Sequence, residues 1–206
     1  TKDESFITLS DGSQLKFLGS ESVWFTGTSV DGTLYVSANN FASATQGYDF
    51  KPGPLDDNGD VKDCINWDRF FRVESRDIIK AQQLFVDGEL SKESLPENIL
   101  YWPARGNPHF FEKYGIELEN QDYASFWDEN SDGIYNPLDG DIPMLSDAFQ
   151  SRQLAIHKFP SYLVYNIFND VGDGSHLLTS GEPMHLEISR YIYTYDIDCS
   201  ENTYFV

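Results

Sequence analysis

A twelve-residue stretch, Asp128 to Asp139, constrains the fold of this chain more than any other part of its sequence. Residues with side-chain oxygens occupy positions 1, 3, 5, 9 and 12, namely Asp128, Asn130, Asp132, Asn136 and Asp139. Position 6 is Gly133, and Ile134 at position 7 needs to offer only its carbonyl. Several oxygens on a sharply curved backbone suit a hard cation such as Ca²⁺. We therefore predict a calcium loop. The alternative is a surface turn whose side chains only bond their own backbone.

The residues after this loop limit what it can do. Position 12 is Asp, which resembles the dockerin loop rather than the bidentate Glu of an EF-hand. In both of those families a helix continues from the loop, but here Gly140-Asp141-Ile142-Pro143 follows, and Gly and Pro stop a helix. We expect an isolated calcium loop between irregular or strand segments, with Asp141 as a candidate extra ligand. A metal there ties loops together rather than moving helices.

Length and charge narrow the class of protein. The 206 residues are 40% hydrophobic, enough to bury one substantial core, so we expect a single domain over residues 1–206, with a small N-terminal hairpin lobe over residues 1–40 as a variant. The formal charge of −20 argues against nucleic acid and anionic membrane surfaces as partners. No apolar run reaches the roughly 18 residues that a membrane-spanning helix needs.

The ends of the chain suggest a segment of something longer. It has no initiator Met and no signal peptide, and Asn202–Val206 looks like the middle of a strand. We expect a processed or excised part of a larger protein.

Cys64 and Cys199 are the only cysteines. In a secreted protein they would pair, closing a long loop that stabilises the fold by roughly 4–5 kcal/mol in the chain-entropy model. In a reducing compartment they would be two buried thiols. Neither has the spacing of a zinc site or a redox motif.

Two strand–turn–strand patterns occupy the first forty residues. Phe6–Leu9 and Gln14–Leu18 flank one Asp-Gly turn, and Val23–Thr26 and Thr33–Ser37 flank another at Asp31-Gly32. Asp-Gly between such runs is a strong hairpin signal. The sequence therefore predicts two hairpins.

One helix is expected, from Ser75 to about Val86, because its apolar residues follow helical spacing. Ser75 is the candidate N-cap and Gly88 the end. A helical turn at Pro96–Leu100, a plain acidic turn at Asp56–Asp60, and strands at Trp67–Val73, Ser161–Phe168 and Met184–Tyr195 complete the prediction. The expected fold is mainly β: an antiparallel β-sandwich-like domain with one short helix, long loops and a calcium-binding loop.

Candidate sites other than the calcium loop are weaker. Trp102, Trp127 and a face formed by Tyr191, Tyr193 and Tyr195 could stack on a sugar, although a sheet core commonly consumes its aromatics. His185 and Glu187 would share one strand face near His176, and we interpret them as a structural or surface pair rather than a transition-metal site. A glycoside hydrolase needs two facing carboxylates, and 34 Asp and Glu make any pair uninformative. An enzyme is therefore the less favoured reading, and no catalytic residue is assigned.

Several blocks of sequence, taken in order, resemble the N-terminal region of large secreted Bacteroidota proteins that are exported by the type IX secretion system and carry a C-terminal sorting domain. The blocks are Asp49–Leu55, Cys64–Arg69, Trp102–Pro108, Phe126–Pro143, Phe168–Asp170 and Gly181–Glu187. Two departures stand out. Extra residues lie roughly at Ser146–Pro160, and the sorting domain is absent from these residues.

The resemblance implies export across the outer membrane and a place at the cell surface or outside the cell. We expect a calcium-stabilised structural or adhesive domain, a cargo of type IX secretion or part of a surface, secretion or motility assembly. Its partners would be other cell-surface or secretion-machinery proteins, or extracellular glycans. The alternative is a glycan-binding module or a glycan-active hydrolase.

Overall fold

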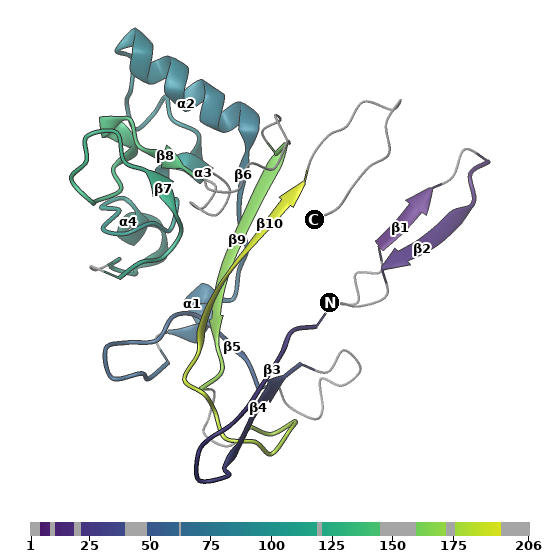
Figure 1. The fold of residues 1–206 in the computed structure, drawn as a ribbon. Coiled ribbons are helices and arrows are strands. Elements are labelled where there is room, and N and C mark those ends of the chain that lie inside the picture. Colours follow the sequence, from purple (N-terminus) through teal and green to yellow (C-terminus); the bar gives the residue numbers. More distant parts are fainter. Residues whose placement is uncertain are drawn as a thin grey trace. The chain divides into compact units, whose positions relative to one another are not determined.

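The computed structural model describes residues 5–8, 11–18, 22–39, 49–61, 63–118, 121–144, 160–171 and 176–194. Their secondary structure is mainly β, in antiparallel sheets, and includes four helices (Figure 1). The chain divides into two compact units: unit 1 holds residues 1–64 and 168–187, and unit 2 holds residues 65–167 and 188–206. No helix in the described ranges is long and apolar enough to cross a lipid bilayer.

Unit 1 contains the two predicted hairpins. Strand β1 (Ser5–Thr8) pairs with β2 (Gln14–Leu18), and β3 (Trp24–Thr28) pairs with β4 (Leu34–Ala38), both antiparallel. The second turn closes because Gly32 adopts a φ of 88° and donates its N–H to the Ser29 carbonyl at 3.0 Å. Glycine adopts a positive φ without the steric cost that other residues have, which explains why the Asp-Gly pair predicts this turn correctly.

Unit 2 is built on a central strand pairing. Strand β6 (Phe71–Glu74) pairs antiparallel with the first half of β9 (Tyr162–Asn169), and β10 (Glu187–Thr194) lies along the other edge of β9. The last two residues of β9 belong to unit 1, where they pair with β5 (Lys51–Pro52). Exposure alternates along β9, so every second side chain is buried. The apolar run predicted at Ser161–Phe168 is thus confirmed as a strand.

Helix α2 (Ser75–Asp87) follows β6 directly, beside α3 (Glu97–Leu100) and β8 (Ile142–Pro143) in Figure 1. Its predicted extent and its end at Gly88, with a φ of 70°, are confirmed. The N-cap prediction is wrong by one residue: Glu74 is the cap, without a side-chain hydrogen bond, because its extended backbone is still part of β6. The turn predicted at Pro96–Leu100 is confirmed as α3.

Other boundaries differ from prediction. The strand expected at Trp67–Val73 is instead the end of α1 (Cys64–Trp67) followed by β6, and α4 (Phe110–Tyr114) was not expected. Both short helices are held by aromatic packing, since Trp67 and Phe110 stack with ring centroids 5.8 Å apart. Helices of this length are not stable alone, so tertiary contacts decide them.

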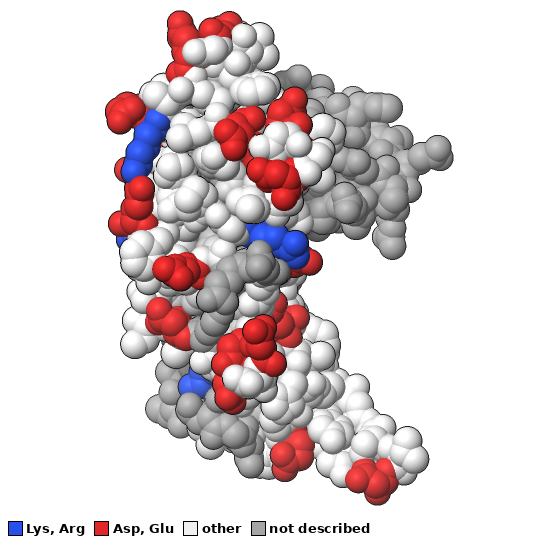
Figure 2. Space-filling model, turned by 90° about the vertical axis from the view of Figure 1, so that its left-hand side faces the viewer, with Lys and Arg blue, Asp and Glu red and all other residues white. Residues whose placement is uncertain are grey.

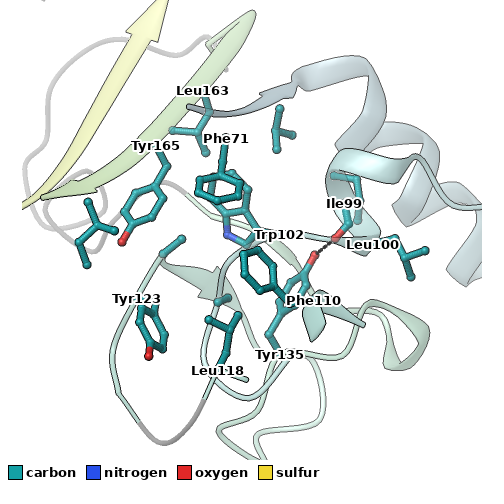
Figure 3. Close-up of a cluster of buried hydrophobic side chains, with 14 of the residues drawn as sticks. Phe71, Ile99, Leu100, Trp102, Phe110, Leu118, Tyr123, Tyr135, Leu163 and Tyr165 are labelled. Atoms are coloured by element: carbon teal, nitrogen blue, oxygen red, sulfur yellow. Dashed lines mark hydrogen bonds between the residues drawn. The ribbon is translucent and has the colours of Figure 1, made fainter. Parts of the chain in front are cut away.

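The core of unit 2 is rich in aromatic rings. In Figure 3, Phe71, Trp102 and Phe110 lie near its centre, with Tyr165 on β9 to one side. Leu163, Ile99 and Leu118 fill the space around them. Full burial of a large apolar side chain stabilises by about 1.5–3 kcal/mol, so this cluster is the main source of stability in the unit.

Candidate metal centre

The predicted calcium loop joins two short strands. It starts after β7 (Phe126–Trp127), passes through the 3-10 turn η1 (Pro137–Asp139) and ends at β8, which pairs antiparallel with β7. The pairing of Phe126 with Pro143 and of Trp127 with Ile142 closes the loop at its base. A strand, not a helix, follows the loop, as its Gly and Pro residues predict.

The first half of the loop is wound around its own polar side chains. Asp128 accepts the N–H groups of Asp132 at 3.2 Å and Gly133 at 2.8 Å through its two oxygens. Asn130 Oδ1 also accepts the Asp132 N–H at 3.0 Å, and Asp132 Oδ1 accepts the Ile134 N–H at 2.8 Å. Gly133 takes a φ of 79°, the sharp bend expected at position 6. Positions 1, 3 and 5 therefore lie on one tight coil of backbone.

The second half brings positions 9 and 12 together. Asn136 caps η1 by accepting the Leu138 N–H at 3.2 Å, and its amide donates to Asp139 Oδ2 at 2.8 Å. Ile134 at position 7 is half-exposed and contacts Gly106, where an added Cβ would lie 2.9 Å from its side chain. The predicted ligands thus form two groups, 128–132 and 136–139, on one short segment.

Asp141 is the buried member of the segment, with 1% of its surface exposed. One carboxylate oxygen accepts the Glu129 N–H at 2.9 Å and the other accepts the Asn136 N–H at 2.8 Å. Burial raises the pKa of Asp141, the two backbone N–H groups oppose this, and the charges of Asp128 and Asp132 raise it further. Asp141 therefore links the two halves of the loop and feels the negative charge of both other carboxylates.

Tyr135 anchors the loop in the core of unit 2. Its ring is fully buried, its hydroxyl donates to the Ile99 carbonyl at 2.7 Å, as the dashed line in Figure 3 shows, and its N–H donates to the Arg105 carbonyl at 2.8 Å. At the other end, Gly140 lies against the ring of Phe85 on α2, since an added Cβ would be 2.8 Å from that ring. The loop is therefore fastened to the core before η1, through Tyr135, and lies against α2 after it, at Gly140.

The carboxylates of the loop have no basic partner in the described part of the chain, where none of the ion pairs includes Asp128, Asp132, Asp139 or Asp141. The same ranges also contain no group of three or more His, Cys, Asp or Glu side chains already placed to hold a metal. The predicted set draws on Asn130, Asn136 and a main-chain carbonyl as well. Its side-chain oxygens accept backbone N–H groups, except that Asp139 Oδ2 and Asp132 Oδ2 accept side-chain amides of the loop.

The aromatic candidates for sugar stacking are mostly core. Trp102 is buried and donates its indole N–H to the Ser125 carbonyl at 3.1 Å. Tyr191 and Tyr193 stack with an interplanar angle of 5°, and Tyr191 packs on Tyr165. Tyr195 lies outside the described residues. Trp127, beside the loop, is the one of these candidates that is exposed among the residues described.

The prediction for His185 and Glu187 is wrong, and the predicted disulfide between Cys64 and Cys199 is not tested. His185 and Glu187 do not share a strand face as predicted, because β10 begins only at Glu187 and His185 has a φ of 55°. Glu187 instead accepts the Leu55 N–H at 2.8 Å. Cys64 is half-buried at the start of α1, and Cys199 lies outside the described residues. The disulfide remains a prediction.

Unit 1 contains a buried polar network that the sequence did not reveal. Asp49 accepts the N–H of Ala38 at 3.0 Å and that of Leu178 at 3.0 Å, and the hydroxyl of Thr179 at 2.8 Å. Asp49 is the first residue of one of the quoted blocks. Asp170 belongs to the block Phe168–Asp170 and accepts N–H groups from the block Gly181–Glu187.

Asp170 is fully buried and collects three donors. It accepts the Ser37 hydroxyl at 2.7 Å, the Met184 N–H at 2.8 Å and the Leu186 N–H at 2.6 Å. Buried His176 lies between these groups, with one ring nitrogen on the Val36 carbonyl and the other 2.5 Å from the Asp170 carbonyl. Asp170 therefore joins two of the blocks, Phe168–Asp170 and Gly181–Glu187, while Asp49 joins the start of a third to residues outside the blocks.

Comparison with known proteins adds nothing to this picture: no family model, no curated protein and no solved structure matches the chain.

Proposed function

We propose that residues 128–141 bind Ca²⁺ and that the chain is a calcium-stabilised structural or adhesive domain of an exported cell-surface protein. The observation that carries the metal assignment is the charge of the loop: Asp128 and Asp132 act on buried Asp141, with no basic side chain paired to them in the described ranges. A divalent cation offsets that repulsion directly.

The ligands would be the five side chains at positions 1, 3, 5, 9 and 12 and the Ile134 carbonyl. A carboxylate or amide oxygen has two lone pairs, so an oxygen that accepts one N–H can still face a cation. Asp141 has both oxygens on backbone N–H groups, and its part is to hold the two halves of the loop together. The ion supplies charge neutralisation and a link between the 128–132 and 136–139 groups.

The cellular part of the proposal rests on the resemblance to type IX-exported proteins. It is supported by the way in which three of the blocks meet: Lys51 and Pro52 pair with Asn169 and Phe168, and Asp170 accepts the N–H groups of Met184 and Leu186. We also propose that the antiparallel sheets of the chain form a β-sandwich-like domain. Calcium is abundant outside cells, so a Kd as weak as about 10⁻⁴–10⁻³ M would keep the site filled.

Thermal unfolding of the full chain with Ca²⁺ or with a chelator tests the metal site. At a hundredfold excess over Kd, binding should add about 2.7 kcal/mol to the free energy of unfolding. Tb³⁺ should occupy the same loop and emit when Trp127, which directly precedes Asp128, is excited. Trp127→Phe should reduce the emission without changing the melting response to Ca²⁺.

The double variant Asp128→Asn, Asp132→Asn removes two charges and keeps one acceptor oxygen at each residue, so it should lose the response to Ca²⁺. Asp57→Asn with Asp60→Asn removes two charges from the other acidic turn and is the matched control. An identical melting midpoint in calcium and in chelator, together with no sensitised Tb³⁺ emission, would refute the proposal.

A second candidate, a glycan-binding module, has one observation in its favour: an open pocket in unit 2 presents the ring of Phe70 to solvent. A hydrolase is less favoured, because Glu97 supplies the pocket's single carboxylate within the described residues. Retaining or inverting glycosidases need two.

A further inference from the structure

Unit 2 has a pocket of about 380 Å³ between β6, α3 and α4. Four aromatic residues line it, together with the basic side chains of Arg72 and Lys113: Phe70, Phe71, Tyr101 and Tyr114. Its rim is open to water, since Phe70 is 62% exposed and the Arg72 side chain 56% exposed. The volume is within the range of small-molecule sites, and a single sugar ring would fill it.

Basic side chains gather on the rings of this pocket. Lys113 Nζ lies 4.6 Å from the ring centre of Tyr101 and 5.7 Å from that of Tyr114. Arg69 lies 4.5 Å from the Tyr114 ring, and Arg190 lies 5.8 Å from the Phe70 ring. A cation therefore lies over one face of each of the rings of Phe70, Tyr101 and Tyr114.

This gathering runs against the composition of the chain. There are 14 Lys and Arg against 34 Asp and Glu, and Figure 2 shows acidic side chains outnumbering basic ones on one face. The pocket lining has two cations, Arg72 and Lys113, and one carboxylate, Glu97. Burial acts to lower the pKa of Lys113, but the 2.6 Å hydrogen bond to Glu97 and neighbouring charges outweigh it and raise that pKa. Lys113 is therefore a permanent cation at neutral pH.

The mixture of groups selects the ligand class. Arg72 and Lys113 favour a carboxylate, the exposed ring of Phe70 favours the flat C–H face of a pyranose, and Glu97 and Asn98 can accept from its hydroxyl groups. A planar aromatic acid would satisfy the cations and the ring but would offer no hydroxyl groups to Glu97 and Asn98. Nucleic acid would be repelled by the net charge of −20.

We propose that this pocket binds a carboxylate-bearing sugar, a uronic acid unit, with Phe70 as the stacking platform and Arg72 and Lys113 as the carboxylate partners. This deepens the second candidate above and is independent of the calcium loop. The pocket holds one sugar ring and is open to water, so the bound sugar can be one residue of a longer polysaccharide that continues into solvent.

Titration calorimetry of the full chain with galacturonic acid and with galactose tests the assignment. The two sugars differ only in the carboxylate that replaces a hydroxymethyl group. Galacturonic acid should bind at least about tenfold more tightly, because charge-assisted hydrogen bonds are the stronger ones. Arg72→Gln and Lys113→Gln should each reduce this preference, and Phe70→Ala should weaken both sugars by about tenfold, the loss of a ring contact.

Two matched controls lie on the same unit. Arg76→Gln removes an exposed cation that pairs with Glu74, and Phe111→Ala removes an exposed ring on α4, and neither residue lines the pocket. Both variants should bind as the unaltered chain does. Circular dichroism melts identify any variant that is unfolded. If Lys113→Gln unfolds, exposed Arg72 carries the test of charge.

Several outcomes would overturn the proposal: no heat with either sugar, equal affinity for both, or unchanged binding by Arg72→Gln. Benzoate binding as tightly as galacturonic acid would overturn the sugar class. Each titration is run with Ca²⁺ and with chelator. Sugar binding that persists without any melting response to calcium refutes the metal proposal alone, and the reverse result refutes the pocket alone.

Discussion

Removing the Asp170 carboxylate should destabilise unit 1 strongly. Asp170→Ala leaves three buried donors without an acceptor: the Ser37 hydroxyl and the N–H groups of Met184 and Leu186. A buried donor left unsatisfied costs about 1–3 kcal/mol. Some relief comes from rotation of the hydroxyl and from water, so we expect a loss of at least about 3 kcal/mol, a large part of the 5–15 kcal/mol typical of a folded domain.

Asp170→Asn isolates the charge and the second acceptor. The amide keeps one oxygen, so it can serve either the Leu186 N–H or the pair formed by Ser37 and Met184. The loss should be about 1–3 kcal/mol, since one backbone donor then faces an NH₂ group. Ordering of the two variants, Ala worse than Asn, follows from the number of acceptors that remain.

Urea unfolding followed by circular dichroism gives the free energies, and amide hydrogen exchange gives the location. The Met184 and Leu186 amides should lose protection in both variants, because their acceptor is altered. Asp57→Asn, in an exposed turn, should stay within about 0.5 kcal/mol of the unaltered chain. A change below about 1 kcal/mol for Asp170→Ala would refute the reasoning, because no buried acceptor could then be at stake.

Three further predictions concern the loop and the cysteines. Gly140→Ala should destabilise the chain by about 2–4 kcal/mol in urea unfolding, because a φ of 102° disfavours any side chain and the new Cβ would meet a phenylalanine ring of α2 at 2.8 Å. Gly133→Ala, with a φ of 79° and open space around it, should cost only the backbone part, about 1 kcal/mol. A larger loss at Gly133 than at Gly140 would contradict this. Tyr135→Phe removes a hydroxyl that donates to a carbonyl of α3, so it should lower the free energy of unfolding by about 1 kcal/mol in urea unfolding. A more stable variant would contradict this prediction. Export to an oxidising compartment predicts that Cys64 and Cys199 form a disulfide. Mass spectrometry after thiol labelling of the unfolded, unreduced chain should find no label, and two labels would exclude the bridge.

Elements that depend on neighbouring residues were predictable. The Asp-Gly hairpins, α2 and β9 all appear where the pattern places them, because a turn with positive φ or an apolar period is a local property. The backbone of the predicted calcium loop belongs with them: Gly133 has the sharp bend expected at position 6, and a strand follows in place of a helix.

Elements that depend on distant residues were not. The strand face expected for His185 and Glu187 does not form, because His185 has a φ of 55° and β10 begins only at Glu187, after Met184 and Leu186 donate their N–H groups to Asp170. Similarly, α1 and α4 are too short to be marked by a period and exist through the stacking of Trp67 on Phe110.

The candidate sites divide in the same way. The sequence by itself determined the order of the candidate oxygen ligands from Asp128 to Asp139 and the negative net charge that favours a cation, because spacing and charge are properties of the chain alone. Only the tertiary structure decided that Asp141 is buried between the two halves of the loop and that Phe70 and Arg72 meet Lys113 around one pocket. Burial and convergence come from packing of segments far apart in the chain, and no local pattern specifies which of 34 acidic or 14 basic side chains will be brought together.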